Sequence, residues 1–279
     1  MTAPVYTNTT ARQLRRIPND LLRSRHLLLD LISKEIRVRY RYAVMGFLWT
    51  ILEPLFLMLV LTFILRYVFN FRFGEDASIA SDAMQVLCAL LAWQFFANGL
   101  ATSTASIVDN RSLVTKVSFP REALPLASVG VALFHFILGA AVFVVLYTIA
   151  SGLPAVHALA IPLLFCVQIA MVAGLGLLFS CLNASFRDIS YIVNTGIFFG
   201  FYASPVFYSP AMVQASLPDF YRYYFINPMA GLITAYRQLL DGVWPSAGML
   251  AWPIAFAAIA LAAGLFVFRR SSPTLADKL

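Results

Sequence analysis

Residues 108–150 read VDNRSLVTKVSFPREALPLASVGVALFHFILGAAVFVVLYTIA, in which a short basic segment precedes a long apolar run. A transmembrane helix needs about 20 predominantly apolar residues to cross the hydrocarbon core of a bilayer. The run 123–150 exceeds this length. The segment before it carries Arg111, Lys116 and Arg121, and short segments rich in Lys and Arg mark the cytoplasmic side of a membrane. The stretch therefore predicts a membrane-spanning helix that starts on the cytoplasmic side.

Further apolar runs of similar character lie elsewhere along the 279 residues, at 43–65, 84–107, 158–182, 189–207 and 248–268. The composition agrees, because 61% of the residues are hydrophobic and 12% are charged, against roughly 45–50% and 25% in soluble domains. We therefore expect an all-α integral membrane protein with six transmembrane helices. The run 189–207 is the least apolar, but without it Arg269 and Arg270 would lie outside the cell.

The distribution of basic residues predicts the orientation of these helices. If residue 1 is cytoplasmic, every Lys and Arg lies on the cytoplasmic side except Arg66, Arg72, Arg222 and Arg237. Such a bias fixes the orientation of a membrane protein, so we expect both termini in the cytoplasm. The formal charge of +7 then reflects basic edges that also attract anionic lipid headgroups, and it does not indicate nucleic-acid binding.

The predicted order divides the chain into a cytoplasmic segment, a membrane domain and a cytoplasmic tail, at 1–42, 43–268 and 269–279. Residues 27–41 (LLLDLISKEIRVRYR) carry an apolar stripe at helical spacing, which predicts an amphipathic helix in the membrane interface. This helix is either a simple anchor or part of a substrate entrance. Residues 226–241 are too short and too mixed to cross, and we expect an amphipathic or re-entrant helix there. A cleavable signal peptide is not expected, since the first 42 residues are polar and basic.

Several classes of active site are excluded by the residues themselves. None of the lysines follows a glycine-rich segment, so the phosphate-binding loop of nucleotide hydrolases is absent. The histidines lie far apart without neighbouring ligands at metal-site spacing, and the cysteines lie within apolar runs. We therefore expect a chain that is not an enzyme, with no catalytic residue, cofactor or metal of its own. Any ATP-driven step has to come from a separate subunit.

The first predicted span places Trp49, Glu53 and Phe56 on one helical face. A carboxylate within a membrane helix is costly unless it faces water or a partner, and it is functional by default. This face is therefore a candidate translocation path. The alternative is that Trp49 belongs to an interfacial aromatic belt while Glu53 pairs with an arginine such as Arg41.

Aromatic residues also gather in and after the fifth predicted span. The candidates for a translocation path are Tyr191, Phe198, Tyr202, Phe207, Tyr208, Tyr221 and Tyr224. Rings that expose a flat face and a hydroxyl suit stacking on sugars, and they equally suit a membrane interface. The Gly196–Gly200 spacing allows close approach of helices, either within the subunit or between two copies.

The segment 109–121 predicts a short amphipathic helix that stops near Pro120. It would present a small apolar surface surrounded by basic side chains. The candidates for contact with another protein are Asp109, Arg111, Leu113, Lys116, Phe119 and Arg121. The alternative is a positively charged loop that only holds the topology.

Four stretches resemble the membrane subunit of bacterial ABC exporters for O-antigen and capsular polysaccharide. They are SLVTKVSFPREALPLAS (112–128), RVRYRYAVMGFLWTILEPL (37–55), SPVFYS (204–209) and INPMAGLITAYRQLL (226–240). The resemblance implies a homodimer in the inner membrane, docked on two copies of a separate ATPase subunit that binds ATP and Mg. By position, 109–121 resembles the coupling helix, 27–41 the cytoplasmic gate helix and 209–241 the external gate helices, with spans one and five lining the channel.

The function implied by this resemblance is ATP-driven export of a lipid-linked polysaccharide, with membrane lipids, the ATPase subunit and the glycan as partners. Arg37, Arg39 and Arg41 are candidates for the pyrophosphate of the lipid carrier, because arginine suits phosphate. Plain inside-positive anchoring explains the same three residues. The alternative functions are an ABC permease for another amphiphile, such as a drug or teichoic acid, and a membrane enzyme acting on lipid-linked sugars.

Overall fold

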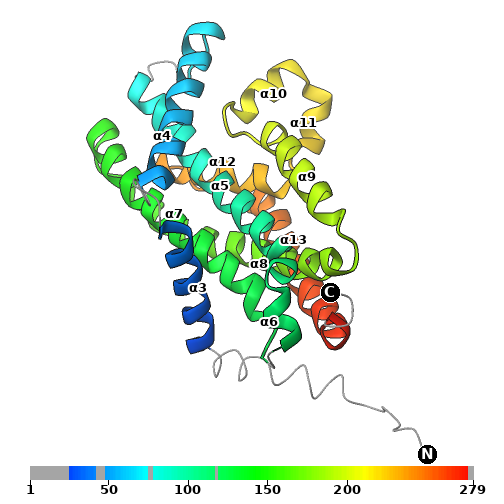
Figure 1. Cartoon of the computed structure of the whole chain (residues 1–279). Helices are drawn as coiled ribbons and strands as arrows, with labels where there is room; N and C mark the ends of the chain where they lie inside the picture. The colour runs from blue at the N-terminus through cyan, green and yellow to red at the C-terminus, as the bar shows by residue number, and fades with distance from the viewer. Residues whose placement is uncertain (1–24, 42–47, 75–77, 117–118, 276–279) are drawn as a thin grey trace, which may run out of the picture.

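The computed structural model describes residues 25–41, 48–74, 78–116 and 119–275, and every regular element in these ranges is a helix (Figure 1). In chain order the elements are α3 (Arg25–Tyr40), α4 (Leu48–Phe63), η1 (Ile64–Val68), α5 (Ile79–Asp109), α6 (Arg111–Lys116), α7 (Ala123–Ser151), η2 (Val156–Ala160), α8 (Ile161–Ser185), α9 (Ile189–Ala203), α10 (Pro210–Ser216), α11 (Pro218–Tyr224), α12 (Pro228–Leu240), α13 (Ala247–Ser271) and η3 (Ser272–Thr274). The predicted all-α fold class is therefore confirmed for the described residues.

Five helical segments in these ranges are long and apolar enough to cross a membrane, namely Leu48–Val68, Ile79–Asp109, Ala123–Ser151, Val156–Ser185 and Ala247–Thr274. They coincide with five predicted runs, although residues 43–47 lie outside the described ranges. The remaining run forms α9, whose 15 residues extend about 22 Å. This length falls short of a hydrocarbon core of about 30 Å. The helix ends before Pro205, which has no N–H to continue the ladder, so a sixth span stays a prediction.

Helix α5 lies at the centre of the fold. In its most apolar window 72% of the residues are buried, against 22–39% in the other four candidate spans, so the other helices enclose α5 and keep apolar surface for lipid or partner chains. Gln168 of α8 ties this centre together, because its amide nitrogen donates to the Ala92 carbonyl of α5 over 2.7 Å. Its amide oxygen accepts from the Tyr236 hydroxyl of α12 at 2.8 Å.

Helices α8 and α13 approach each other so closely that glycine is required on both. A Cβ atom on Gly174 would lie 2.4 Å from the carbonyl carbon of Ala260. A Cβ atom on Gly264 would lie 2.1 Å from the carbonyl oxygen of Gly174. Small residues allow such backbone contact between membrane helices, where dispersion rather than the hydrophobic effect drives association.

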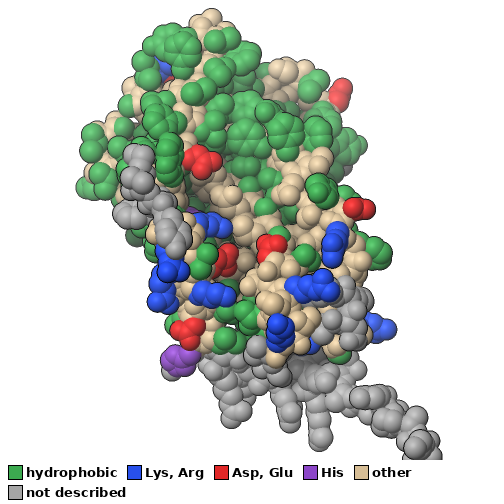
Figure 2. All heavy atoms as spheres, in the orientation of Figure 1, with side chains coloured by type: hydrophobic (Ala, Val, Ile, Leu, Met, Phe, Trp, Pro, Cys, Tyr) green, Lys and Arg blue, Asp and Glu red, His purple; other side chains and the backbone are tan. Residues whose placement is uncertain are grey.

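Helix α3 confirms the helix predicted at 27–41, and it packs against α7. Ile32 fills the space beside Gly130, where an added Cβ would lie 2.4 Å from the Ile32 Cδ1 atom. Helices α3 and α6 and the carboxy-terminal end of α13 lie at the same end of the molecule (Figure 1). Figure 2 shows most of the Lys and Arg side chains gathered at this end, with a largely hydrophobic surface beyond it. The interfacial position of α3 stays a prediction.

The helix predicted within 226–241 is α12, in which ten of 13 residues are buried. Pro228 occupies its first turn, and the Asn227 side chain accepts a hydrogen bond from the Met229 N–H at 3.0 Å, which caps the helix. Protein therefore surrounds most of α12, and the alternative of an amphipathic interfacial helix stays a prediction. The re-entrant alternative stays a prediction. Helices α10 and α11 lie at the end of the molecule away from α3 (Figure 1).

Candidate functional site

One face of α4 carries the predicted group of Trp49, Glu53 and Phe56. All three side chains are exposed, and the exposed fraction of both Trp49 and Phe56 is 55%. Pro54, between them, is buried inside the helix. The described part of the chain therefore leaves this face uncovered, with an acidic group between two large aromatic rings.

Helix α9 is the most exposed of the apolar helices, because Val193 alone among its 15 residues is buried. Tyr191, Phe198 and Tyr202 are exposed by 74%, 58% and 54%. The rings of Phe198 and Tyr202 meet edge to face with centroids 5.4 Å apart, an arrangement that aromatic pairs favour. Exposed aromatic rings therefore lie along one side of this helix.

The Gly196–Gly200 pair of α9 serves two different surroundings. A Cβ on Gly200 would lie 2.9 Å from Trp93 of α5, so this glycine is needed for packing within the chain. A Cβ on Gly196 would meet no atom within 4 Å. Gly200 therefore allows close approach of helices within the subunit, the first of the two alternatives. Gly196 lies on the exposed face of α9.

The aromatic residues that follow α9 are much less accessible than those on it. Tyr224 is only 6% exposed, while Phe207, Tyr208 and Tyr221 are partly buried. The Tyr224 hydroxyl donates to the Tyr208 hydroxyl at 3.2 Å, and the Tyr208 hydroxyl donates to the Tyr202 carbonyl at 3.1 Å. Burial raises the pKa of the Tyr208 and Tyr224 phenols above their usual value. In this arrangement Tyr224 braces the segment and does not present a ring to a ligand.

Arg237 organises this end of the molecule, although the sequence motifs gave it no predicted role. It is 6% exposed, and it donates to the carbonyls of Gln85, Val206 and Tyr208 over 3.1, 2.8 and 2.9 Å. Its guanidinium carbon lies 4.7 Å from the centroid of the Phe73 ring. Burial lowers the pKa of Arg237 to about 10, which leaves it charged at neutral pH. The sequence did contain one indication of a special role: Arg237 is one of the four basic residues that do not lie on the predicted cytoplasmic side.

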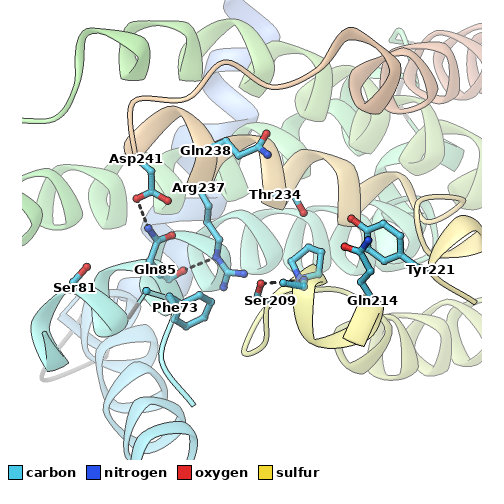
Figure 3. Close-up of a pocket in the computed structure, with 13 residues that line it drawn as sticks. Phe73, Ser81, Gln85, Ser209, Gln214, Tyr221, Thr234, Arg237, Gln238 and Asp241 are labelled. Atoms are coloured by element: carbon cyan, nitrogen blue, oxygen red, sulfur yellow. Dashed lines mark hydrogen bonds between the residues drawn. The ribbon is translucent and has the colours of Figure 1, made fainter. Parts of the chain in front are cut away.

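A cavity of about 440 Å³ adjoins Arg237, between α5, α10, α11 and α12 (Figure 3). Gln85 and Asp241 lie on one wall, where the Gln85 amide donates to the Asp241 carboxylate at 2.7 Å. Tyr221 lines the same cavity. Tyr221 is a predicted path residue, but none of the path candidates on α4 and α9 lines this cavity with it.

A second cavity, of about 280 Å³, lies where α3 and α4 meet α5 and α7. Arg39, Trp49 and Glu53 line it, so the structure brings one predicted entrance arginine beside two predicted path residues. The Tyr40 hydroxyl on its wall is 2.8 Å from both the Thr50 hydroxyl and the His135 Nε2 atom. The other two entrance candidates, Arg37 and Arg41, are exposed, and Arg37 Nε donates to the Ser33 carbonyl at 3.2 Å.

The segment 109–121 contains the expected short helix, α6, but its residues face differently from those of the expected apolar surface. Val114 is 2% exposed, and it packs in a cluster with Ile107 and Leu124. Phe119 packs against the same cluster, and the Arg121 guanidinium donates to the Ser272 carbonyl. The surface of this corner is therefore mainly polar and basic, with the exposed residues Asp109, Arg111, Ser112, Thr115 and Lys116 and the partly exposed Leu113.

A groove beside this corner runs between α3, α5, α7 and α9, and it holds Glu35 and Asp109. Burial raises the pKa of the Glu35 carboxyl above its ordinary value, and the nearby Asp109 adds to the rise. Arg39 and Lys34 oppose it. The basic end of the molecule therefore includes an acidic group that holds its proton more strongly than a free glutamate does.

Known proteins match the chain over most of its length. The family described as ABC-2 type transporter matches residues 26–240. An O-antigen export system permease protein RfbA from Myxococcus xanthus is 30% identical over 224 residues, which are 80% of this chain and 84% of that protein. Two proteins of the same name from Klebsiella pneumoniae are 30% and 29% identical, covering 78% and 76% of this chain and 81% and 79% of their own. With its bundle of long apolar helices, this chain belongs to the ABC-2 type transporter family of multi-pass membrane proteins.

Proposed function

We propose that the chain is the membrane subunit of an ATP-driven exporter that moves a lipid-linked polysaccharide across the bacterial inner membrane. The glycan is an O-antigen or a capsule. The observation that carries the proposal is the exposed polar and aromatic face of α9. The O-antigen export permeases to which the chain is similar support the choice of substrate.

The exposed face of α9 is poorly suited to hydrocarbon. Besides its aromatic rings it exposes Asn194 and Thr195, and polar groups that meet lipid without a partner are costly. Their exposure favours a water-filled path on this side of the helix. A homodimer in which the α4 and α9 faces of two copies meet around a common axis encloses such a path and removes the polar groups from lipid.

The chemistry of the path suits a long polymer of sugars. A glycan loses its hydration at high cost in hydrocarbon, so it needs a wet passage with weak contacts. The rings of Trp49, Phe56 and Tyr202 offer flat faces for stacking, and Glu53 can accept hydrogen bonds from hydroxyl groups. Repeated weak contacts let a chain advance, whereas one tight site would hold it, as in ion conduction.

The lipid carrier enters at the basic end. Arg37, Arg39 and Arg41 bind the pyrophosphate, because the planar guanidinium matches phosphate geometry. The cavity that Arg39 shares with Trp49 and Glu53 supports this choice, since it places one of the three arginines beside the first residues of the path. In the same orientation, both termini lie in the cytoplasm and α9 completes a sixth span with the residues that flank it.

Energy comes from two copies of a separate subunit that binds ATP and Mg. The exposed polar surface of α6 docks on this subunit, with Arg111 and Lys116 as charged contacts. Val114 supports the proposal, because its burial against Ile107 and Leu124 joins α6 to the ends of α5 and α7. A push on α6 therefore reaches two of the spans.

The test is deletion of the gene, followed by a gel of surface and intracellular polysaccharide. We expect the surface glycan to disappear and the lipid-linked glycan to accumulate inside. A copy with Phe198→Ala and Tyr202→Ala should restore export poorly. A copy with Phe266→Ala, which changes an equally exposed ring on α13, should restore it fully. Normal surface glycan in the deletion strain would refute the proposal.

A further inference from the structure

The cavity beside Arg237 has the size of a small-molecule site. Its volume of about 440 Å³ lies within the roughly 300–1,000 Å³ of typical ligand pockets. It lies at the end of the molecule away from α3, and helices α10 and α11 form part of its wall (Figures 1 and 3). It is separate from the exposed faces of α4 and α9. The cavity can hold a short piece of glycan, but not a folded polymer.

Two acceptors in its lining lack hydrogen-bond partners among the described residues. They are the amide oxygens of Gln85 and Gln238, and both atoms are buried. Gln85 is 6% exposed, and the bond from its amide nitrogen to Asp241 fixes which end of the amide is the oxygen. A buried acceptor without a donor costs about 1–3 kcal/mol. A ligand that donates hydrogen bonds to these two oxygens would therefore remove this cost, and the gain in free energy would favour binding.

The charges of the cavity favour a neutral ligand. Arg237 contributes a positive charge, but its guanidinium already donates to three backbone carbonyls and lies over Phe73. Asp241 contributes a negative charge on the same wall (Figure 3). With one charge of each sign, the site offers little net attraction to an anion or a cation.

The remaining lining combines hydroxyl groups with aromatic rings. The Ser81 hydroxyl can donate or accept a hydrogen bond, and the Thr234 hydroxyl, which donates to the Ala230 carbonyl, can accept one. Phe73 and Tyr221 line the same cavity from different elements (Figure 3), and aromatic faces pack against the C–H faces of sugar rings while hydroxyls bind at the edges. A compound with several hydroxyls and an apolar face matches this set of groups.

We propose that this cavity binds a neutral sugar unit of the exported glycan, at a site apart from the path along α4 and α9. The proposal rests on the proposed function for the source of the sugar. Because α10 and α11 wall the cavity, a bound sugar connects these two helices to α5 and α12. After the glycan has left the path along α4 and α9, each protomer binds it again at this cavity. This second contact opposes movement of the glycan back into the path.

The test is direct binding to the purified full-length protein in nanodiscs, observed by saturation-transfer NMR. The probes are methyl glycosides of glucose, galactose, mannose and rhamnose, together with methyl glucuronide as a charged comparison. We expect at least one neutral glycoside to bind in the millimolar range and to bind more tightly than the glucuronide. Gln238→Leu and Thr234→Val should each weaken binding by about tenfold, the loss of one hydrogen bond worth about 1.4 kcal/mol.

Thr148→Val is the matched control. The Thr148 and Thr234 hydroxyls each donate to the carbonyl four residues earlier, at 2.8 and 2.7 Å, but Thr148 lies outside the cavity lining. This variant should bind the glycoside as the wild type does. Absence of binding by every neutral glycoside, tighter binding of the glucuronide, or unchanged binding by both cavity variants would overturn the assignment. If glycosides bind but gene deletion leaves export intact, the proposed function fails and the sugar site stands.

Discussion

Replacing Gly174 by alanine should separate two helices that are now in backbone contact. The new Cβ would lie 2.4 Å from both the Ala260 carbonyl carbon and the Leu261 nitrogen, and 2.5 Å from the Leu261 Cα. Ordinary contact begins near 3.5 Å, so α8 and α13 must move apart by about 1 Å. Overpacking costs about 1–3 kcal/mol. We expect the upper part of this range, because the atoms that are struck belong to a backbone and cannot rotate away.

The matched control is Gly196→Ala on α9, where the added Cβ meets nothing within 4 Å. It should stabilise slightly, since alanine is favoured over glycine in a helix by about 0.5–1 kcal/mol. The measurement is thermal unfolding of the purified protein in detergent. At about 2–4 °C per kcal/mol for chains of about this size, Gly174→Ala should melt roughly 5–10 °C below the wild type. If the two variants melt together, the close approach of α8 and α13 is wrong.

Three further predictions follow from charged groups. Glu35→Gln should raise the melting temperature at pH 7 but not near pH 4. The reason is that the pKa of Glu35 is raised in the folded protein, so its ionisation costs stability as the pH increases. An equal change in melting temperature at both pH values would contradict this. Arg237→Lys should lower the free energy of unfolding by about 2–4 kcal/mol, since one ammonium group cannot donate to all three buried carbonyls. Chemical denaturation measures this free energy, and an unchanged midpoint would refute the assigned role. Arg111→Glu with Lys116→Glu should weaken retention of the ATPase subunit about tenfold in co-purification, without changing the melting temperature, because both side chains are exposed; full retention would exclude α6 as the docking surface.

The spans could be predicted from sequence because their signal is local. Apolar length alone marks 123–150, and the helix runs from Ala123 to Ser151. The short helix α6 was predictable for the same reason, from apolar and basic residues at helical spacing before Pro120. The exposed face of Trp49, Glu53 and Phe56 followed from helical periodicity. Each of these features depends on residues within a few turns of one another.

The features that sequence missed depend on partners far along the chain. Gly174 and Gly264 carry no GxxxG spacing within one helix, and their importance comes from a contact across 90 positions. The Gly196–Gly200 pair has the spacing, but only Gly200 packs inside the chain. Periodicity equally could not reveal that Tyr224, unlike Tyr202, turns inward, because burial is set by the packing of α11 against its neighbours.

Helix α5 links the two ends at which we propose that this protein binds its partners. It carries Asp109 beside α6 at the basic end and Gln85 in the cavity at the other end, and its 31 residues extend about 46 Å. The helix contains no proline, which is a frequent cause of sharp kinks. The Gln85 carbonyl accepts from Arg237, which also holds the carbonyls after α9. We therefore expect a shift of α5 at its basic end to reach the segment after α9 through Arg237 and the carbonyls that it binds.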